Sequence, residues 1–296
     1  MSIKVGILMG GPSEEREVSI HTGKAVLEAC KSNGYITTEY FFQNDYRSFL
    51  KNLKDQEIIF NALHGGIGEN GKIQEWMDKH NIRYTGSGPT ASAKCMDKAK
   101  SKEIAKLIGM KTPEWEILFS QNDLPTLSLP FVIKPNDQGS TVGLSIVHND
   151  SDIKPALIKA FQHGNVVMVE KYISGRELTV TVLGGKAYPI IEIKPSHELY
   201  DYECKYIKGM SEYICPADLS EQLAKSIQND TELIYEELKC NVYARADYLM
   251  DEIGDYYFLE MNTLPGMTST SLVPKSVNAT GMSFDDLVKN IIELSL

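Results

Sequence analysis

The spacing of apolar and polar positions predicts alternating strands and helices over the first 88 residues. Continuous apolar runs at residues 3–9 and 58–63 are typical of buried parallel strands. Helical spacing predicts a helix over residues 14–33, and residues 37–42 are predicted as the strand that follows it. This alternation indicates a Rossmann-like βαβ domain, in which ligands gather beyond the carboxyl ends of the strands.

Short apolar runs and helical periods also alternate through the middle of the chain. The predicted strands span residues 130–135, 142–147 and 166–173, and the predicted helices span residues 96–108 and 150–161. We expect these elements to form a central domain of residues 89–172, which follows an N-terminal domain of residues 1–88.

The remaining residues, 173–296, are predicted as a C-terminal domain. Its first two predicted strands span residues 177–185 and 186–193, and a predicted helix spans residues 220–238. Residues 194–214 are polar and aromatic without a clear period, and a loop this long inside a compact domain is often a lid. A last helix is expected to begin at Ser283 and to bury one stripe of side chains, namely Leu287, Val288, Ile291, Ile292 and Leu294.

Two strands near the C-terminus alternate polar and apolar positions. They span residues 242–250 and 257–262. A hairpin turn midway between them would place Asp247 opposite Glu260 and Arg245 opposite Asn262, with all four side chains on one face. The apolar residues expected on the other face are Ala246, Tyr248, Met250, Leu259 and Met261.

The polar face of this hairpin is a candidate metal site. Two acids directly opposite one another repel, so Asp247 and Glu260 are expected to need a cation between them. Carboxylate and amide oxygens are ligands that Mg²⁺ accepts. The alternative is an exposed face with an ordinary salt bridge to Arg245. The Pro-Gly turn and the Ser/Thr-rich segment at residues 263–271 favour a metal site beside a substrate.

The composition excludes several classes of protein. With 42% hydrophobic and 24% charged residues, the 296-residue chain resembles soluble globular proteins. Its net charge of −10 disfavours non-specific nucleic-acid binding, which needs a basic surface. Five scattered cysteines without a CxxC spacing indicate free thiols in a reducing cytosol. The first residues lack a signal-peptide pattern, and no apolar run has the length of a membrane span.

Two loops of the N-terminal domain carry candidate ligand-binding residues. Gly10-Gly11 after the first strand is not a GxGxxG dinucleotide fingerprint, and the acids that follow favour a cationic ligand group. Glu15 could therefore receive an ammonium, but an acid at a helix start is also stabilised by the helix dipole alone. His64, after the third strand, is likewise either a ligand contact or a polar loop residue.

The central domain contains a lysine followed by a glycine-containing loop. Lys134 ends a strand, and the N–H groups and hydroxyls of residues 136–141 could fold over phosphates. A Walker A sequence is absent, and a plain hairpin loop explains the same residues. The strand at residues 166–173 could meet an adenine edge while Glu177 binds ribose hydroxyls, or it could be a linker between domains.

Seven motifs along the chain, taken together, resemble those of the D-alanine–D-alanine ligase family of ATP-grasp enzymes. They are Gly10-Gly-Pro-Ser-Glu-Glu15-Arg-Glu-Val-Ser19, Leu63-His64-Gly65, Met96-Asp-Lys98, Lys134-Pro with Gly139-Ser140-Thr141-Val142-Gly143, Tyr200-Asp-Tyr-Glu-Cys-Lys205-Tyr206, Arg245-Ala-Asp247, and Glu260-Met-Asn262-Thr-Leu-Pro-Gly266-Met-Thr-Ser-Thr-Ser271-Leu272. The resemblance spans essentially the whole chain, and its last motif together with the Tyr200–Tyr206 motif is highly specific.

The resemblance implies an α/β (α+β) chain with a three-domain ATP-grasp fold, whose N-terminal domain is the Rossmann-like βαβ unit. ATP would lie between the central and C-terminal domains and would phosphorylate the carboxylate of one D-alanine. The amine of a second D-alanine would then attack the acyl phosphate, and phosphate would leave. Phosphoryl transfer depends mainly on positioning and charge neutralisation. The product, D-alanyl-D-alanine, would supply peptidoglycan precursor synthesis.

The resemblance also implies a role for each site residue. Two Mg²⁺ ions, or Mn²⁺ in their place, would lie on Asp247, Glu260 and Asn262. ATP would contact Lys98, Lys134, Glu170, Lys171, Ile173, Glu177 and Lys205. The D-alanine molecules would contact Glu15, His64, Arg245, Gly266, Ser271 and Leu272. The catalytic set would be Glu15, Ser140, Tyr206 and Arg245, in which Arg245 stabilises the oxyanion and the other three close the lid.

Two departures from the family pattern leave the required groups in place. Tyr172 stands where the family often has a tryptophan beside the adenine, and Asp137-Gln138 replace an arginine and an acid of some relatives. The family further implies a cytoplasmic homodimer that has neither a nucleic acid nor a membrane as a partner.

Three alternative functions are considered beside D-alanyl-D-alanine synthesis. The first is a D-alanine–D-lactate ligase, against which Tyr206 counts because a histidine is expected in the lid of depsipeptide ligases. The second is a regulatory protein that binds a nucleotide without catalysis, although the polar residues of the hairpin face are all retained. The third is an ATP-grasp ligase for another acid and amine, which only the resemblance disfavours.

Overall fold

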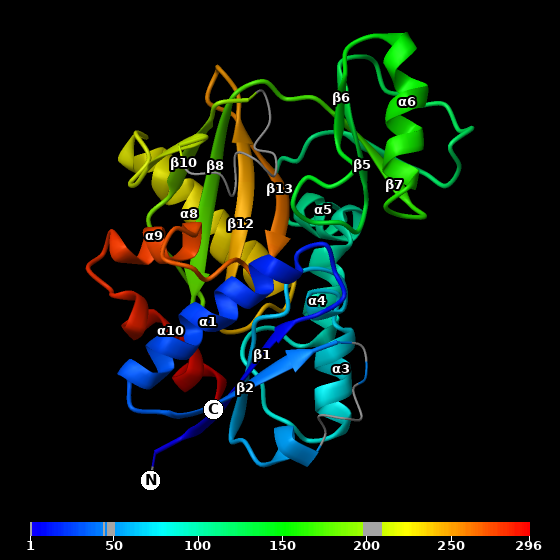
Figure 1. Cartoon of the computed structure of the whole chain (residues 1–296). Helices are drawn as coiled ribbons and strands as arrows, with labels where there is room; N and C mark the ends of the chain where they lie inside the picture. Colours follow the sequence, from blue (N-terminus) through cyan, green and yellow to red (C-terminus); the bar gives the residue numbers. More distant parts are fainter. Residues whose placement is uncertain (1, 44, 46–50, 198–208) are drawn as a thin grey trace.

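Three β-sheets organise the part of the chain that the computed structural model describes, namely residues 2–43, 45, 51–197 and 209–296 (Figure 1). The N-terminal sheet is parallel, in the order β2-β1-β3. Its strands are β1 (Lys4–Gly10), β2 (Ile36–Phe42) and β3 (Ile58–Asn61). Helices α1 (Arg16–Ser32) and α10 (Phe284–Ser295) cover one face, and α3 (Lys72–Lys79) covers the other. The predicted Rossmann-like unit is therefore confirmed.

The central sheet is antiparallel, in the order β4-β7-β5-β6. It consists of β4 (Trp115–Leu118), β5 (Phe131–Pro135), β6 (Ser145–Val147) and β7 (Val167–Lys171), with α6 (Asp150–Phe161) packed on it. Helices α4 (Pro89–Met96) and α5 (Lys98–Leu107) connect it to the N-terminal sheet (Figure 1). The strand predicted at residues 142–147 is shorter than expected, because residues 142–144 turn and Gly143 has a φ of 73°.

The C-terminal sheet has the strand order β11-β10-β8-β12-β13, and β9 also pairs with β8. Its strands are β8 (Arg176–Leu183), β9 (Lys186–Ala187), β10 (Ile191–Pro195), β11 (Ser211–Ile214), β12 (Tyr243–Met250) and β13 (Tyr256–Asn262), and α8 (Glu221–Glu237) packs against it. The predicted strand at residues 186–193 is interrupted between β9 and β10. The predicted lid at residues 194–214 begins in β10 and ends in β11, and these two strands pair with each other. Residues 198–208, between them, lie outside the described residues.

The β12–β13 hairpin has the predicted pairing at its polar end. Arg245 pairs with Asn262, and Asp247 pairs with Glu260. The register then shifts by one residue, so Tyr248 pairs with Phe258 and Leu259 has no opposite residue. The expectation that Leu259 joins the apolar face is wrong. Phe258 is buried in the core instead, while Leu259 lines a pocket.

The last two helices return the chain to the N-terminal sheet. Helix α9 (Leu272–Asn278) follows the Ser/Thr-rich segment at a place where no element was predicted, and Pro274 fits its first turn because the N–H groups there have no helical partner. The predicted stripe on α10 is buried except for Leu294, which is 51% exposed, so its assignment to the core is wrong. Side chains of α9 and α10 share one core with β1 and α1. The domain limits at residues 88 and 172 stay predictions.

Gly68 provides a test of how tightly the loop after β3 packs. A Cβ atom there would lie 1.7 Å from the carbonyl oxygen of Leu63. We expect Gly68→Ala to reduce the free energy of unfolding by about 1–3 kcal/mol, as overpacking does, measured by urea denaturation. Gly88→Ala is the matched control, because its nearest neighbour is the Tyr84 hydroxyl at 3.8 Å. Equal midpoints for the two variants would contradict this packing.

Candidate active site

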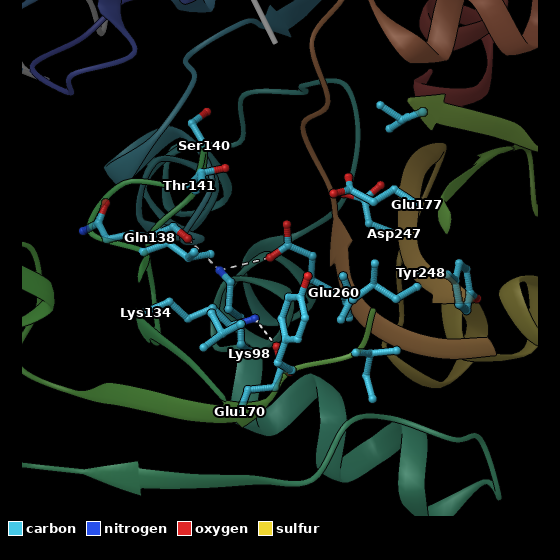
Figure 2. Close-up of a pocket in the computed structure, with 18 of the residues that line it drawn as sticks. Lys98, Lys134, Gln138, Ser140, Thr141, Glu170, Glu177, Asp247, Tyr248 and Glu260 are labelled. Atoms are coloured by element: carbon cyan, nitrogen blue, oxygen red, sulfur yellow. Dashed lines mark hydrogen bonds and ion pairs between the residues drawn. The ribbon is translucent and has the colours of Figure 1, made fainter. Parts of the chain in front are cut away.

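A first pocket lies between the central and C-terminal sheets and has a volume of about 180 Å³. It is lined by the loop at residues 136–141 and by strands β5, β7, β8, β12 and β13 (Figure 2). Six residues predicted to contact ATP are among its lining, namely Lys98, Lys134, Glu170, Lys171, Ile173 and Glu177. Tyr172 lines it too, whereas Lys205 is outside the described residues. The structure therefore gathers one predicted set of residues around one cavity.

A second pocket of about 490 Å³ adjoins the first. It contains every residue predicted to contact D-alanine, namely Glu15, His64, Arg245, Gly266, Ser271 and Leu272. The lining shared by both pockets comprises Gly139, Ser140, Arg245, Glu260 and Leu272. A group bound in one pocket can therefore meet a group bound in the other at this junction.

The loop at residues 136–141 is held in place at its first residues. Asp97 caps α5 and accepts a hydrogen bond from the Asn136 side chain at 2.8 Å. The Lys98 ammonium donates to the carbonyl oxygen of Gln138 at 2.6 Å. Ser140 and Thr141 have φ values of 51° and 65°, a conformation that costs energy for residues other than glycine. This strain beside a pocket favours a ligand-binding loop over a plain hairpin loop.

Glu15 connects the N-terminal domain to this loop. Its side chain accepts a hydrogen bond from the Ser140 hydroxyl and makes no capping bond to α1. The predicted contact between Glu15 and Ser140 is thus present. The reading of Glu15 as a simple helix-start acid does not explain why its carboxylate reaches a loop of another domain. Tyr206, the third predicted member, lies outside the described residues.

His64 is buried rather than exposed in a loop, with 4% of its surface accessible. Its Nε2 lies 2.9 Å from the Thr22 hydroxyl, and its Nδ1 lies 3.4 Å from a carboxylate oxygen of Glu69. The pocket residues that the sequence analysis missed include Glu69, His21 and Tyr213. A short 3₁₀ turn (Gly66–Gly68) precedes Glu69, and nothing in the local sequence marked that residue as facing a pocket.

The two acids of the hairpin face each have a cationic partner. Arg245 donates to both carboxylate oxygens of Asp247, at 2.9 and 2.7 Å, and the Thr179 hydroxyl donates at 2.6 Å. Lys98 pairs with Glu260 at 3.1 Å, as Figure 2 shows. Side chains therefore already supply a positive charge to each acid, and the metal site on these residues stays a prediction.

The donor set nevertheless fits Mg²⁺ beside a nucleotide. Among the described residues, no group of three or more His, Cys, Asp or Glu is arranged to hold a metal. Mg²⁺ commonly takes only one or two carboxylates and completes its octahedron with phosphate oxygens and water. Asp247 and Glu260 are directly paired across the strands, and Asn262, two residues after Glu260, is on the same face. Lys98 and Arg245 could turn from these acids to phosphate oxygens.

Glu170 is the most enclosed acid of the first pocket, with 3% of its surface exposed. Lys134 donates to one of its oxygens at 2.6 Å, and Lys102 pairs with the other. Burial opposes ionisation, but the two ammonium groups outweigh it and hold the pKa of Glu170 below its usual range. Glu170 is therefore a carboxylate, and one of its two counter-ions, Lys102, was not predicted.

No helix in the described ranges is both long and apolar enough for a bilayer crossing.

Comparisons with known proteins agree with the geometry. The family described as D-ala D-ala ligase C-terminus matches residues 104–293. The D-alanine–D-alanine ligase of Syntrophotalea carbinolica is 43% identical over 98% of this chain and 95% of its own length. That of Aquifex aeolicus is 40% identical over 98% of this chain and 100% of its own.

Solved structures give the same result over the whole chain. The Bacillus anthracis D-alanine–D-alanine ligase complexed with ATP has a TM-score of 0.88 at 34% identity, covering 99% of this chain and 97% of that one. The VanG D-Ala:D-Ser ligase from Enterococcus faecalis has a TM-score of 0.86 at 26% identity, covering 100% of both chains.

Proposed function

Since this chain belongs to the D-alanine–D-alanine ligase family and has its ATP-grasp fold, we propose that it joins two D-alanine molecules into D-alanyl-D-alanine while ATP is converted to ADP and phosphate. The observation that carries the proposal is the junction of the two pockets. Gly139, Ser140, Arg245 and Glu260 line both cavities, so a γ-phosphate from one can reach a carboxylate in the other. The product would serve peptidoglycan synthesis and hence the cell wall.

The first step needs the residues that surround the phosphates. An unactivated carboxylate resists attack by an amine, because its oxygen is a poor leaving group. Transfer of the γ-phosphoryl group onto D-alanine makes that oxygen part of a phosphate. Lys98 and Lys134 line the first pocket and can neutralise charge on the phosphates, while the backbone at Gly139 and Ser140 positions them.

Mg²⁺ is part of the proposal. Asp247, Glu260 and Asn262 would hold it, and the bound ion would neutralise charge on the β- and γ-phosphates. Before ATP binds, Lys98 and Arg245 balance the same two acids. When the nucleotide brings its own negative charge, Lys98 and Arg245 would turn to its phosphates, and Mg²⁺ would take their place beside Asp247 and Glu260.

The second step uses the substrate pocket. Glu15 would hold the ammonium of the first D-alanine, while Ser271, Leu272 and the backbone of Gly266 would hold the second. The second amine forms the C–N bond, loses a proton, and expels phosphate as the acyl C–O bond breaks. Arg245 donates to the oxyanion of the tetrahedral intermediate, where a positioned donor is most effective. A cytoplasmic homodimer is proposed from the family.

The test is ATP-dependent phosphate release with a panel of substrates. We expect release with D-alanine alone and none with L-alanine, with the dipeptide identified by mass spectrometry. D-Serine is included as a second substrate because a D-Ala:D-Ser ligase matches the whole chain in structure. If release required D-alanine together with D-lactate or D-serine, and D-alanine alone gave none, the proposed product would be wrong.

A further inference from the structure

Lys102 is a fully buried lysine that none of the steps above uses. Its side chain is 0% exposed, and it does not line the ATP pocket, although Glu170 and Lys134 both do. It lies on α5, pairs with Glu170, and donates to the Thr112 hydroxyl at 2.7 Å. Burial lowers the pKa of its ammonium to about 8, which leaves it protonated at pH 7. Burying a charged lysine is costly, so an interaction that depends on this charge is expected to offset the cost.

The charge balance of Glu170 with its two lysines shows what the buried charge of Lys102 can do. One carboxylate between two ammonium groups leaves a net charge of +1 in the cluster. If Lys134 were the only partner, its charge would be consumed by Glu170. Turning Lys134 toward a phosphate would then leave a buried carboxylate without a counter-ion, which is strongly unfavourable. With Lys102 in place, Glu170 stays neutralised whichever way Lys134 points.

Lys102 is also well fixed. Besides Thr112 and Glu170, its ammonium lies 3.4 Å from the carbonyl oxygen of Phe258, to which Thr112 donates at 2.8 Å. Phe258 stands on β13, the strand that carries Glu260. Helix α5, strand β7 and strand β13 therefore meet at one ammonium, which lies behind the pocket, whereas Lys134 lines it.

We propose that Lys102 is a positioning residue for ATP: it is the permanent counter-ion of Glu170, and it thereby releases Lys134 to bind a phosphate of the nucleotide. The inference rests on the proposed function only in requiring that ATP binds in the first pocket. Lys102 itself touches no substrate. Its effect is therefore expected on the phosphate part of the nucleotide and not on the adenosine part.

Equilibrium titration of the purified full-length protein with ATP and with adenosine tests this inference. We expect Lys102→Met to weaken ATP binding about 10-fold or more while adenosine binding changes by less than about 3-fold. Lys106→Met is the matched control, because Lys106 is an exposed lysine one turn further along α5. Its ATP-to-adenosine affinity ratio should equal that of the unmodified protein. Equal losses for ATP and adenosine in Lys102→Met would indicate a merely structural role and overturn the inference.

A second pair of variants keeps the test decisive if Lys102→Met does not fold. Once Glu170→Gln removes the buried negative charge, no counter-ion is needed. Adding Lys102→Met to Glu170→Gln should then leave the ATP-to-adenosine ratio of the single variant unchanged, and a further fall of about 10-fold would overturn the inference. If the unmodified protein bound no ATP, the proposed function would fail instead, so the two failures are distinguishable.

Discussion

Glu260→Gln is expected to lower kcat/KM for dipeptide formation at least about 100-fold while the fold is retained. Even the outer hydrogen-bond partners of metal ligands are worth about 10–100-fold, so loss of a ligand charge should cost more. Glu260 lines both pockets and pairs with Lys98 at 3.1 Å. The change preserves size and removes only the negative charge, so urea denaturation should give a midpoint near that of the unmodified protein.

The control for Glu260→Gln is the same change at Glu116. That carboxylate accepts hydrogen bonds from the backbone and hydroxyl of Thr126, at 2.7 and 2.6 Å, and lines neither pocket. Glu116→Gln should leave turnover unaffected. The Mg²⁺ concentration that gives half-maximal rate should rise only in Glu260→Gln. Unchanged activity and unchanged Mg²⁺ dependence in that variant would remove Glu260 from the proposed metal site.

Arg245→Lys is expected to reduce kcat about 10²–10³-fold, the loss typical of one oxyanion donor. The substitution keeps the charge, but lysine cannot reproduce the planar guanidinium fork of Arg245, which donates to both oxygens of Asp247 before ATP binds and can present a fixed donor to the oxyanion afterwards. The donor that should face the oxyanion is then misplaced. Phosphate-release kinetics at saturating ATP and D-alanine measure the effect on kcat.

Arg176→Lys is the matched control for this prediction. Arg176 makes a similar two-bond pair with Glu192, at 2.9 and 2.6 Å, in the same sheet, and it lines neither pocket. Weakening this pair should lower the free energy of unfolding and leave kcat near that of the unmodified protein. Equal losses of kcat in the two lysine variants would mean that Arg245 only stabilises the C-terminal sheet and does not act on the oxyanion.

The fold was predictable where the pattern is local. Alternation with a period of two placed Asp247, Glu260 and Asn262 on one face of the hairpin, because side chains of a strand point alternately to opposite faces. The extra residue at Leu259 was not predictable, since a bulge follows from how β13 fits β12 and its other neighbours. Helix α9 was missed because Ser, Thr and Pro around residue 271 are typical of loops.

The amino-acid sequence by itself determined the strand–helix order, the polar hairpin face and, through its motifs, the family. Only the tertiary structure decided which of these residues meet. It brought the two pockets together at Ser140 and Arg245, drew Glu15 to a loop of the central domain, and placed Lys102 behind Glu170. Periodicity reports on neighbours along the chain. Contacts between distant side chains, and the burial that sets their charges, exist only after the sheets have packed.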